Sequence, residues 1–133
     1  MRVDFYEMSG RFTDPLFVAA VLVGRAWPGA QRVAIVAGRA QLMELDSRLW
    51  TEPKDRFLPH GIDQDNAPIL LSDTAPEQAE VLINLDPGAP IPDGQFERVL
   101  ELVPSDEQTR SLLRERWRAW KGRGAEVNHH ILK

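Results

Sequence analysis

Apolar residues recur along this chain in two patterns, one typical of helices and the other of buried strands. At helical spacing they occupy residues 14–27 and 39–50, and the first of these stretches ends before the turn signal Pro28-Gly29. Continuous runs of β-branched and other apolar residues are typical of parallel strands that are buried on both faces. From such runs and from shorter ones we predict strands at Val3–Tyr6, Arg32–Ala37, Ile69–Leu71, Val81–Leu85 and Phe96–Val103.

Two segments rich in proline and glycine, Gly61–Glu80 and Asp86–Gly94, are predicted to be loops. A last helix is predicted from Ser105, which is a favourable cap and is followed by two acidic residues, and an extended tail covers Ala125–Lys133. The order of these elements predicts an α/β fold: one domain of three layers, with a largely parallel central sheet flanked by helices.

The composition is that of a soluble globular protein. Together with the sequence it excludes cysteine chemistry, a signal peptide and a membrane-spanning segment. The chain has 133 residues, of which 43% are hydrophobic and 27% charged. It contains no cysteine, which excludes disulfides and thiol chemistry. The first residues carry charges, unlike a signal peptide, and the longest apolar run is too short to span a bilayer. We therefore expect a cytoplasmic protein.

Charge is distributed very unevenly along the chain. The stretch Arg110–Arg123 holds six basic residues and one acidic residue, for a net charge of +5. The whole chain has a net charge of −4, so the remaining residues carry −9. A concentrated basic patch on an acidic protein indicates a site that attracts a negatively charged partner.

Helical periodicity divides this basic stretch into two faces. At about 100° per residue, the basic face holds Arg110, Arg114, Trp117 and Lys121, with Arg118 at its edge. The opposite face, predicted to pack on the core, holds Leu112, Leu113, Ala119 and Trp120. We expect Arg116 to pack its stem on the leucine side and to pair its guanidinium with an acid.

A basic face with one aromatic residue in it predicts a site for an anion or an acidic peptide. Trp120 is explained by the core, whereas Trp117 lies among arginines and has no structural explanation in the sequence. The alternative is that the arginines form a solvated surface and stack on an exposed tryptophan, which is a common surface arrangement.

The chain shows no constellation of catalytic or cofactor-binding residues. The glycine-rich loops that bind nucleotide phosphates are missing after both early strands. His129 and His130 are adjacent and would point to opposite faces of a strand, and His60 follows a proline in a loop. The serines lack the context of a nucleophile. We predict no catalytic residue, no metal site and no cofactor.

A second surface is predicted where the helix over residues 39–50 ends. Trp50 and Phe57 are large aromatic residues near that end, and Pro53 and Pro59 flank Phe57. They form either a plug at the edge of the core or an exposed apolar anchor for a protein partner.

Taken together, these stretches resemble the chi subunit family of bacterial DNA polymerase III. The opening strand contains Phe5-Tyr6, Leu45–His60 reads L-D-x-x-L-W-x-x-P-x-x-x-F-x-P-H, and Val81–Leu85 matches a strand. Val103-Pro104 precedes the last helix, and Arg114–Trp120 reads R-E-R-aromatic-basic-A-aromatic. These features are spread over nearly the whole chain.

The resemblance implies a non-catalytic adaptor of the clamp loader, with a topology like that of nucleotide-binding proteins but without a nucleotide. It implies a binding site for the acidic C-terminal tail of single-stranded DNA-binding protein, at Val103, Arg110, Arg114, Trp117 and Arg118. It also implies a second site, for the psi subunit or a competing repair helicase, at Trp50, Phe57 and Pro59. We expect a monomer until a partner binds.

Two other functions remain open from the residues alone. The basic helix could contact nucleic acid directly, but the charge of −9 elsewhere and the overall pI of about 5.4 disfavour this. A degenerate nucleotide-binding protein with a cryptic phosphate site is the other alternative, and the missing glycine-rich loop disfavours it. We therefore predict no direct binding of nucleic acid.

Overall fold

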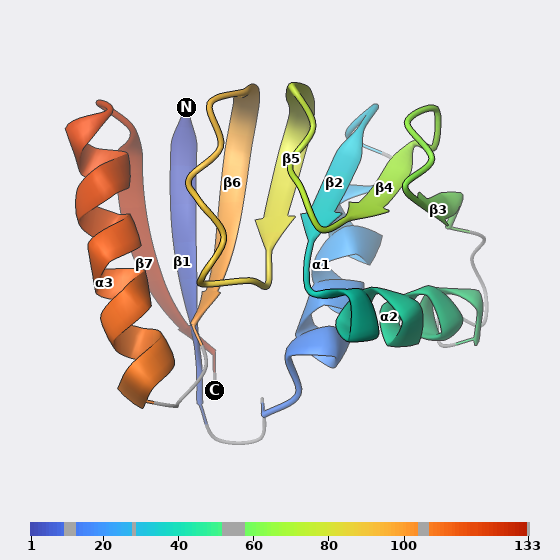
Figure 1. The fold of residues 1–133 in the computed structure, drawn as a ribbon, viewed down its shortest axis with the longest axis horizontal. Helices are drawn as coiled ribbons and strands as arrows, with labels where there is room; N and C mark the ends of the chain where they lie inside the picture. Colours follow the sequence, from blue (N-terminus) through green and yellow to red (C-terminus); the bar gives the residue numbers. More distant parts are fainter. Residues whose placement is uncertain (10–12, 28, 52–57, 104–106, 133) are drawn as a thin grey trace.

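A computed structural model describes residues 1–9, 13–27, 29–51, 58–103 and 107–132. In that part of the chain, seven strands form a single sheet in the order β3-β4-β2-β5-β6-β1-β7, and every neighbouring pair is parallel. Three helices flank the sheet, so the predicted three-layer α/β architecture is confirmed (Figure 1).

The elements follow the predicted order, with additions. The strands are β1 (Arg2–Met8), β2 (Val33–Val36), β3 (His60–Ile62), β4 (Ile69–Ser72), β5 (Gln78–Asn84), β6 (Gln95–Val103) and β7 (Glu126–Leu132). The helices are α1 (Pro15–Ala26), α2 (Arg39–Thr51) and α3 (Glu107–Gly122). The prediction that Gly61–Glu80 is a loop is wrong in part: most of β3 and the start of β5 lie there, together with β4, which matches the strand predicted at Ile69–Leu71. The predicted tail is a strand, β7, at the edge of the sheet beside β1.

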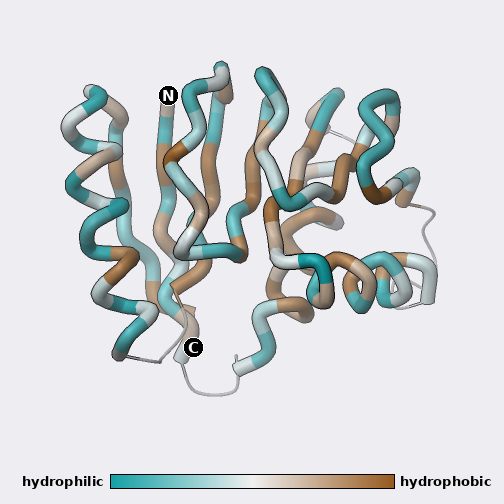
Figure 2. The backbone as a smooth tube through the Cα atoms, in the orientation of Figure 1, coloured by the Kyte–Doolittle hydropathy of each residue, from teal (hydrophilic) through white to brown (hydrophobic). Residues whose placement is uncertain are grey.

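Successive side chains of each strand point to opposite faces of the sheet, and the apolar ones form one cluster on each face. Val33 and Ile35 of β2 face a cluster that also contains the buried residues of α1 and α2. Ala34 and Val36 face the other cluster, to which Leu113 and Trp120 of α3 belong. The brown hydrophobic positions of Figure 2 accordingly gather in the central strands, whereas α3 is mostly teal.

Side-chain contacts fix the ends of the helices. The carboxylate of Asp14 accepts a hydrogen bond from the backbone N–H of Leu16 at 3.0 Å and caps α1, where Pro15 is the first helical residue. The same carboxylate pairs with Arg48 of α2 at 2.6 Å, which ties α1 to α2. Helix α3 ends at a turn in which Gly124 has a φ of +83°, a conformation that favours glycine.

Two connections between parallel strands cross the face of the sheet without a helix. Residues 73–77 lead from β4 to β5, and residues 85–94 lead from β5 to β6, as predicted for that loop. Ala75, Ala89 and Ile91 in these segments pack on the cluster of α3. At Gly94 the two segments meet, where a Cβ atom would collide with the backbone of Glu77. Helix α3 covers only the part of this face near the β7 edge of the sheet (Figure 1), where it contacts β7 and β6.

Candidate functional site

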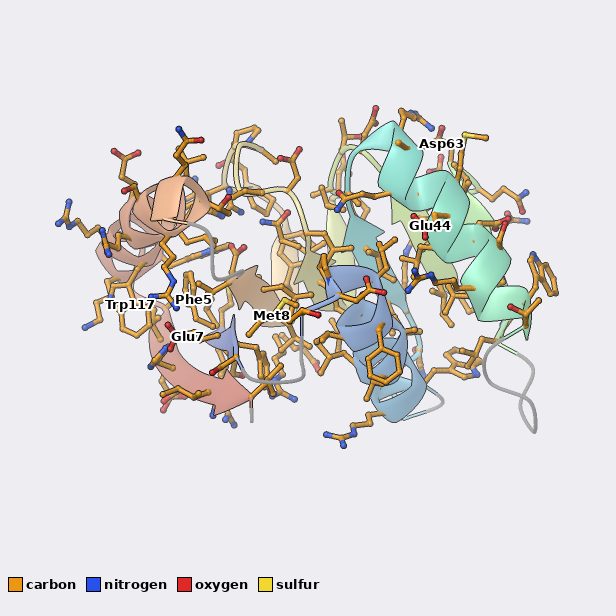
Figure 3. The ribbon with its side chains drawn as sticks, turned by 90° about the horizontal axis from the view of Figure 1, so that it is seen from below. Phe5, Glu7, Met8, Glu44, Asp63 and Trp117 are labelled. Carbon is orange, nitrogen blue, oxygen red and sulfur yellow. The ribbon has the colours of Figure 1, made fainter. Side chains whose placement is uncertain are left out.

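A groove of about 450 Å³ lies between α3 and the carboxyl ends of the strands beneath it. Figure 3 looks at these strand ends and shows Phe5 and Trp117 close together, with Glu7 beside them. Both sides of the groove contribute charged and aromatic side chains. Its lining residues are Phe5, Glu7, Val103, Arg110, Leu113, Arg114, Trp117, Arg118 and His129.

The floor of the groove comes from three adjacent strands. Phe5 and Glu7 are two residues apart on β1, so their side chains point to the same face of the sheet. In the parallel pairing, Phe5 is in register with His129 of β7, and Glu7 is in register with Val103 of β6. The pairing of β1 with both neighbours therefore brings these four side chains onto one face.

The wall of the groove is one side of α3, anchored by a buried leucine. Leu113 is buried in the cluster beneath the helix, whereas Arg114 and Arg118 are exposed. Trp117 is half-buried and packs its ring on Phe5, with 5.1 Å between ring centroids and a tilt of 52°. Nζ of Lys121 lies 5.4 Å from the centroid of the Trp117 ring, within the range of a cation–π contact.

The groove carries both signs of charge. Nη2 of Arg110 lies 2.5 Å from one carboxylate oxygen of Glu7, and Nε2 of His129 lies 3.3 Å from the other. The three arginines of the lining outnumber the single carboxylate, so the groove is electropositive. Guanidinium groups beside an aromatic wall suit a ligand that has carboxylates and an apolar side chain.

Beneath the groove, a buried network holds α3 on the sheet. Glu101 of β6 is fully buried and accepts hydrogen bonds from Nε of Arg116 at 2.9 Å and from Nε1 of Trp120 at 2.9 Å. Asn84 of β5 donates to the other carboxylate oxygen of Glu101 at 2.6 Å, and Arg116 also donates to the carbonyl oxygen of Ala89. The predictions that Arg116 pairs with an acid and that Trp120 belongs to the core are confirmed.

The predicted division of α3 into faces needs one correction. Leu112 and Ala119 were expected on the core side but are exposed. The buried face is centred on Leu113, Arg116 and Trp120 instead, because the paired guanidinium of Arg116 takes a central buried position. Trp117 was expected to lack a structural role, yet its contact with Phe5 packs it partly against the sheet.

All the residues predicted for the tail site line this one groove. They are Val103, Arg110, Arg114, Trp117 and Arg118. The sequence prediction missed Phe5, Glu7, Leu113 and His129. Glu7 and His129 come from opposite ends of the chain and meet only through the pairing of β1 with β7. The i, i+2 spacing of Phe5 and Glu7 was the only local signal that both could face the helix.

The second predicted surface lies at the far end of α2, away from the groove. Trp50 is 56% exposed, and its ring lies 4.5 Å from the ring of His60, centroid to centroid. Met43, two turns earlier on α2, is also exposed, and Pro59 is half-buried. Leu49 and Leu58 are buried beside it, whereas Trp50 is not, so Trp50 does not plug the core. Phe57 lies outside the described residues.

Neither a cluster of metal-binding side chains nor a membrane-spanning helix occurs in the part of the chain that the structure describes. The described residues contain no group of three or more histidine, aspartate or glutamate side chains that could hold a metal ion. Nor does any helix among them have the length and apolar character needed to cross a bilayer. His129 and His130 point to opposite faces, as expected, since they contact Glu7 and Asp4 respectively.

Comparisons with known proteins agree with the resemblance seen in the sequence. The model of the family described as DNA polymerase III chi subunit, HolC, matches residues 1–128. A protein of Pseudomonas aeruginosa named DNA polymerase III subunit chi is 34% identical over 98% of this chain and 96% of its own length. Proteins of the same name from Haemophilus influenzae and Escherichia coli are 28% and 25% identical, each over 80% of this chain and over 80% and 78% of their own lengths.

The fold also occurs in a solved structure with little sequence similarity. A chain in a complex of S. cerevisiae Dbp5 with Nup159, Gle1, IP6 and ADP matches with a TM-score of 0.66 and 14% identity. The match covers 98% of this chain but only 42% of that one. At this identity the likeness shows the fold alone.

Proposed function

The chain belongs to the DNA polymerase III chi subunit family and has a role in DNA replication, and we propose that it acts there as a cytoplasmic, non-catalytic adaptor. Its groove beside α3 binds the acidic, hydrophobic-ended C-terminal tail of single-stranded DNA-binding protein. The observation that carries this proposal is the convergence of Arg110, Arg114, Arg118 and Trp117 on one groove that also contains Phe5.

The chemistry of the groove matches that of such a tail. The arginines supply charge-assisted hydrogen bonds for carboxylates, and the rings of Phe5 and Trp117 supply an apolar surface for the last side chain. Val103, the last residue of β6, adds to this apolar surface. A peptide bound in this one groove makes a small interface, for which we expect micromolar affinity, about −8 kcal/mol.

Recruitment to coated DNA tests this function and separates it from direct DNA binding. A labelled single-stranded oligonucleotide coated with single-stranded DNA-binding protein should bind the chain, as measured by fluorescence anisotropy. Removal of the tail from the coating protein should end the recruitment, and bare oligonucleotide should not bind at about 0.15 M salt. Equal binding to bare and coated DNA, unaffected by removal of the tail, would make the chain a nucleic-acid binder.

The exposed end of α2 supports a second binding surface, which we assign to the psi subunit or to a helicase of the DNA-repair type. Trp50 and Met43 form the exposed apolar part of that surface among the described residues. Pro59 directly precedes His60, whose ring contacts that of Trp50. A large exposed aromatic residue at a helix end is typical of an anchor that a partner buries. The two surfaces lie on different elements, so one chain can bind both partners and act as an adaptor.

Trp50→Ala tests this second surface. We expect the variant to lose co-purification with its clamp-loader partner while it still binds the tail peptide. Leu112→Ala, a change at another exposed apolar residue on α3, is the matched control and should keep both activities. A large fall in melting temperature for Trp50→Ala would instead indicate a structural role.

A further inference from the structure

The groove beside α3 contains a carboxylate of its own among three arginines. Glu7 uses both of its oxygens, one toward Nη2 of Arg110 at 2.5 Å and the other toward Nε2 of His129 at 3.3 Å. Its side chain is only 20% exposed, and it points into the groove from β1. An acidic residue in this place works against the binding of an anion, so a role in tail binding alone does not explain it.

The contact between Glu7 and Arg110 involves only one of the guanidinium nitrogens among the described contacts. Nε of Arg110 is buried and donates to no acceptor among the residues that the structure describes. Arg110 contacts Glu7 through Nη2, so the pair does not form the bidentate contact through Nε and Nη2 that guanidinium and carboxylate groups can form. A small rearrangement of Arg110 toward another carboxylate can therefore exchange one partner for the other.

We propose that Glu7 is a specificity-determining residue of this groove, acting as the chain's own substitute for the terminal carboxylate of a bound peptide. This inference rests on the proposed tail-binding function. A ligand that binds must share Arg110 with Glu7 or displace it, and its negative charges meet the negative charge of Glu7.

This arrangement selects ligands by more than their charge. A ligand that offers only negative charge, such as a phosphate backbone, gains the arginines but is repelled by Glu7. A peptide that ends in an aromatic residue also buries its ring against Phe5 and Trp117, and that gain is independent of Glu7. Glu7 therefore lowers the affinity of the groove for every anion. Only a ligand that also has a terminal aromatic side chain recovers enough binding energy to bind.

The test compares Glu7→Gln with the wild-type chain on two synthetic acidic peptides that end in phenylalanine. One peptide has a free terminal carboxylate and the other a terminal amide. Glu115→Gln is the matched control, because Glu115 is exposed on α3, does not line the groove and gives the same change in net charge. Calorimetric titration gives the affinities, and thermal melting shows that each variant is folded.

We expect Glu7→Gln to bind the free-acid peptide on the order of tenfold more tightly than wild type, because a like charge beside the ligand is gone. The gain for the amidated peptide should be clearly smaller, since that peptide does not compete for Arg110 with a terminal carboxylate. Glu7→Gln should also bind a bare single-stranded oligonucleotide more tightly than wild type does, whereas Glu115→Gln should match wild type in every titration.

Other outcomes separate this inference from the proposed function. If wild type binds the free-acid peptide but Glu7→Gln binds it equally or more weakly, Glu7 is not a competitor and the inference is wrong. The inference is also wrong if Glu7→Gln raises the affinity for both peptides equally. Glu7 would then repel any acidic peptide by its charge and would not compete with the terminal carboxylate for Arg110. If wild type binds neither peptide, tail binding itself is wrong.

Discussion

Two arginines of helix α3 pair with glutamates of the sheet, and the two pairs consist of the same residue types but differ in their surroundings. Arg116 pairs with Glu101 at 2.9 Å, and these side chains are only 7% and 0% exposed. Arg110 pairs with Glu7 at 2.5 Å, and there the exposed fractions are 30% and 20%. Each pair joins α3 to a strand beneath it, and the two arginines are six residues apart.

The difference lies in how completely the hydrogen bonds are made. Glu101 accepts bonds from Arg116, Trp120 and Asn84, and Arg116 also donates to the carbonyl oxygen of Ala89. In the groove, Nε of Arg110 has no acceptor among the described residues. A fully bonded buried pair fixes one arrangement, whereas a partly bonded and accessible pair can exchange its partner. We infer that the first pair holds the helix and the second belongs to the binding surface.

The largest expected effect comes from breaking the buried pair. Glu101→Ala should lower the free energy of unfolding by about 3–5 kcal/mol, because it leaves the Arg116 guanidinium buried without a counter-ion. Denaturant unfolding measures this loss. Glu101→Gln, which keeps an acceptor for Trp120, should lose less. A loss of only about 0.5 kcal/mol for Glu101→Ala, the usual size for a surface change, would show that the network does not hold α3.

A smaller effect, on affinity and not on stability, is expected in the groove. Arg114→Ala should weaken binding of the tail peptide by about 1.5–3 kcal/mol, the range for a lost hydrogen bond to a charged group. The free energy of unfolding should change by only about 0.5 kcal/mol, because Arg114 is exposed on α3. Calorimetric titration checks the affinity, with Arg25→Ala on α1 as an exposed control of equal charge change. Unchanged affinity would contradict the site.

The sequence predicts the fold well where a strand is a continuous apolar run. Val33–Val36 and Ile69–Ser72 are buried at every position, and their apolar runs identified both. The three-residue strand His60–Ile62 has no such signal, because only its central glycine is buried. The role of Glu126–Leu132 as a strand beside β1 depends on pairing between the two ends of the chain, which no local pattern encodes.

The residues of the groove also differ in whether a local sequence pattern could predict them. The residues on α3 were predicted because helical spacing gathers them in the sequence itself. The strand side was missed, because Glu7 and His129 reach the groove only through the sheet. The error at Leu112 has a different cause: hydropathy assigns arginines to the surface, and a buried, paired Arg116 shifts the core face of α3 away from that leucine.

A third carboxylate, on the opposite face of β1 from Glu7, combines features of both pairs. Asp4 is fully buried, as Glu101 is, but its partners are partly exposed, as in the groove. It contacts Arg98 at 2.8 Å, His130 at 2.9 Å and Arg2 at 3.1 Å. Burial alone would raise the pKa of Asp4, but the hydrogen bonds from His130 and Arg98 and the charges of Arg98 and Arg2 lower it below 3.8.

The smallest effect is therefore expected at Asp4, and it should depend on pH. Because the pKa of Asp4 is lower in the folded chain than in the unfolded one, its contribution is present above about pH 4 and is lost as the pH falls through the folded-state value. Asp4→Asn should reduce the free energy of unfolding by about 1–2 kcal/mol at neutral pH. Urea unfolding at about pH 7 and about pH 3 should show that the difference in the free energy of unfolding between variant and wild type shrinks at the lower pH.

A difference that stays constant would mean that the charge of Asp4 contributes nothing. A loss as large as that of Glu101→Ala would mean that burial of the carboxylate alone, and not exposure of its partners, decides which pairs hold the fold.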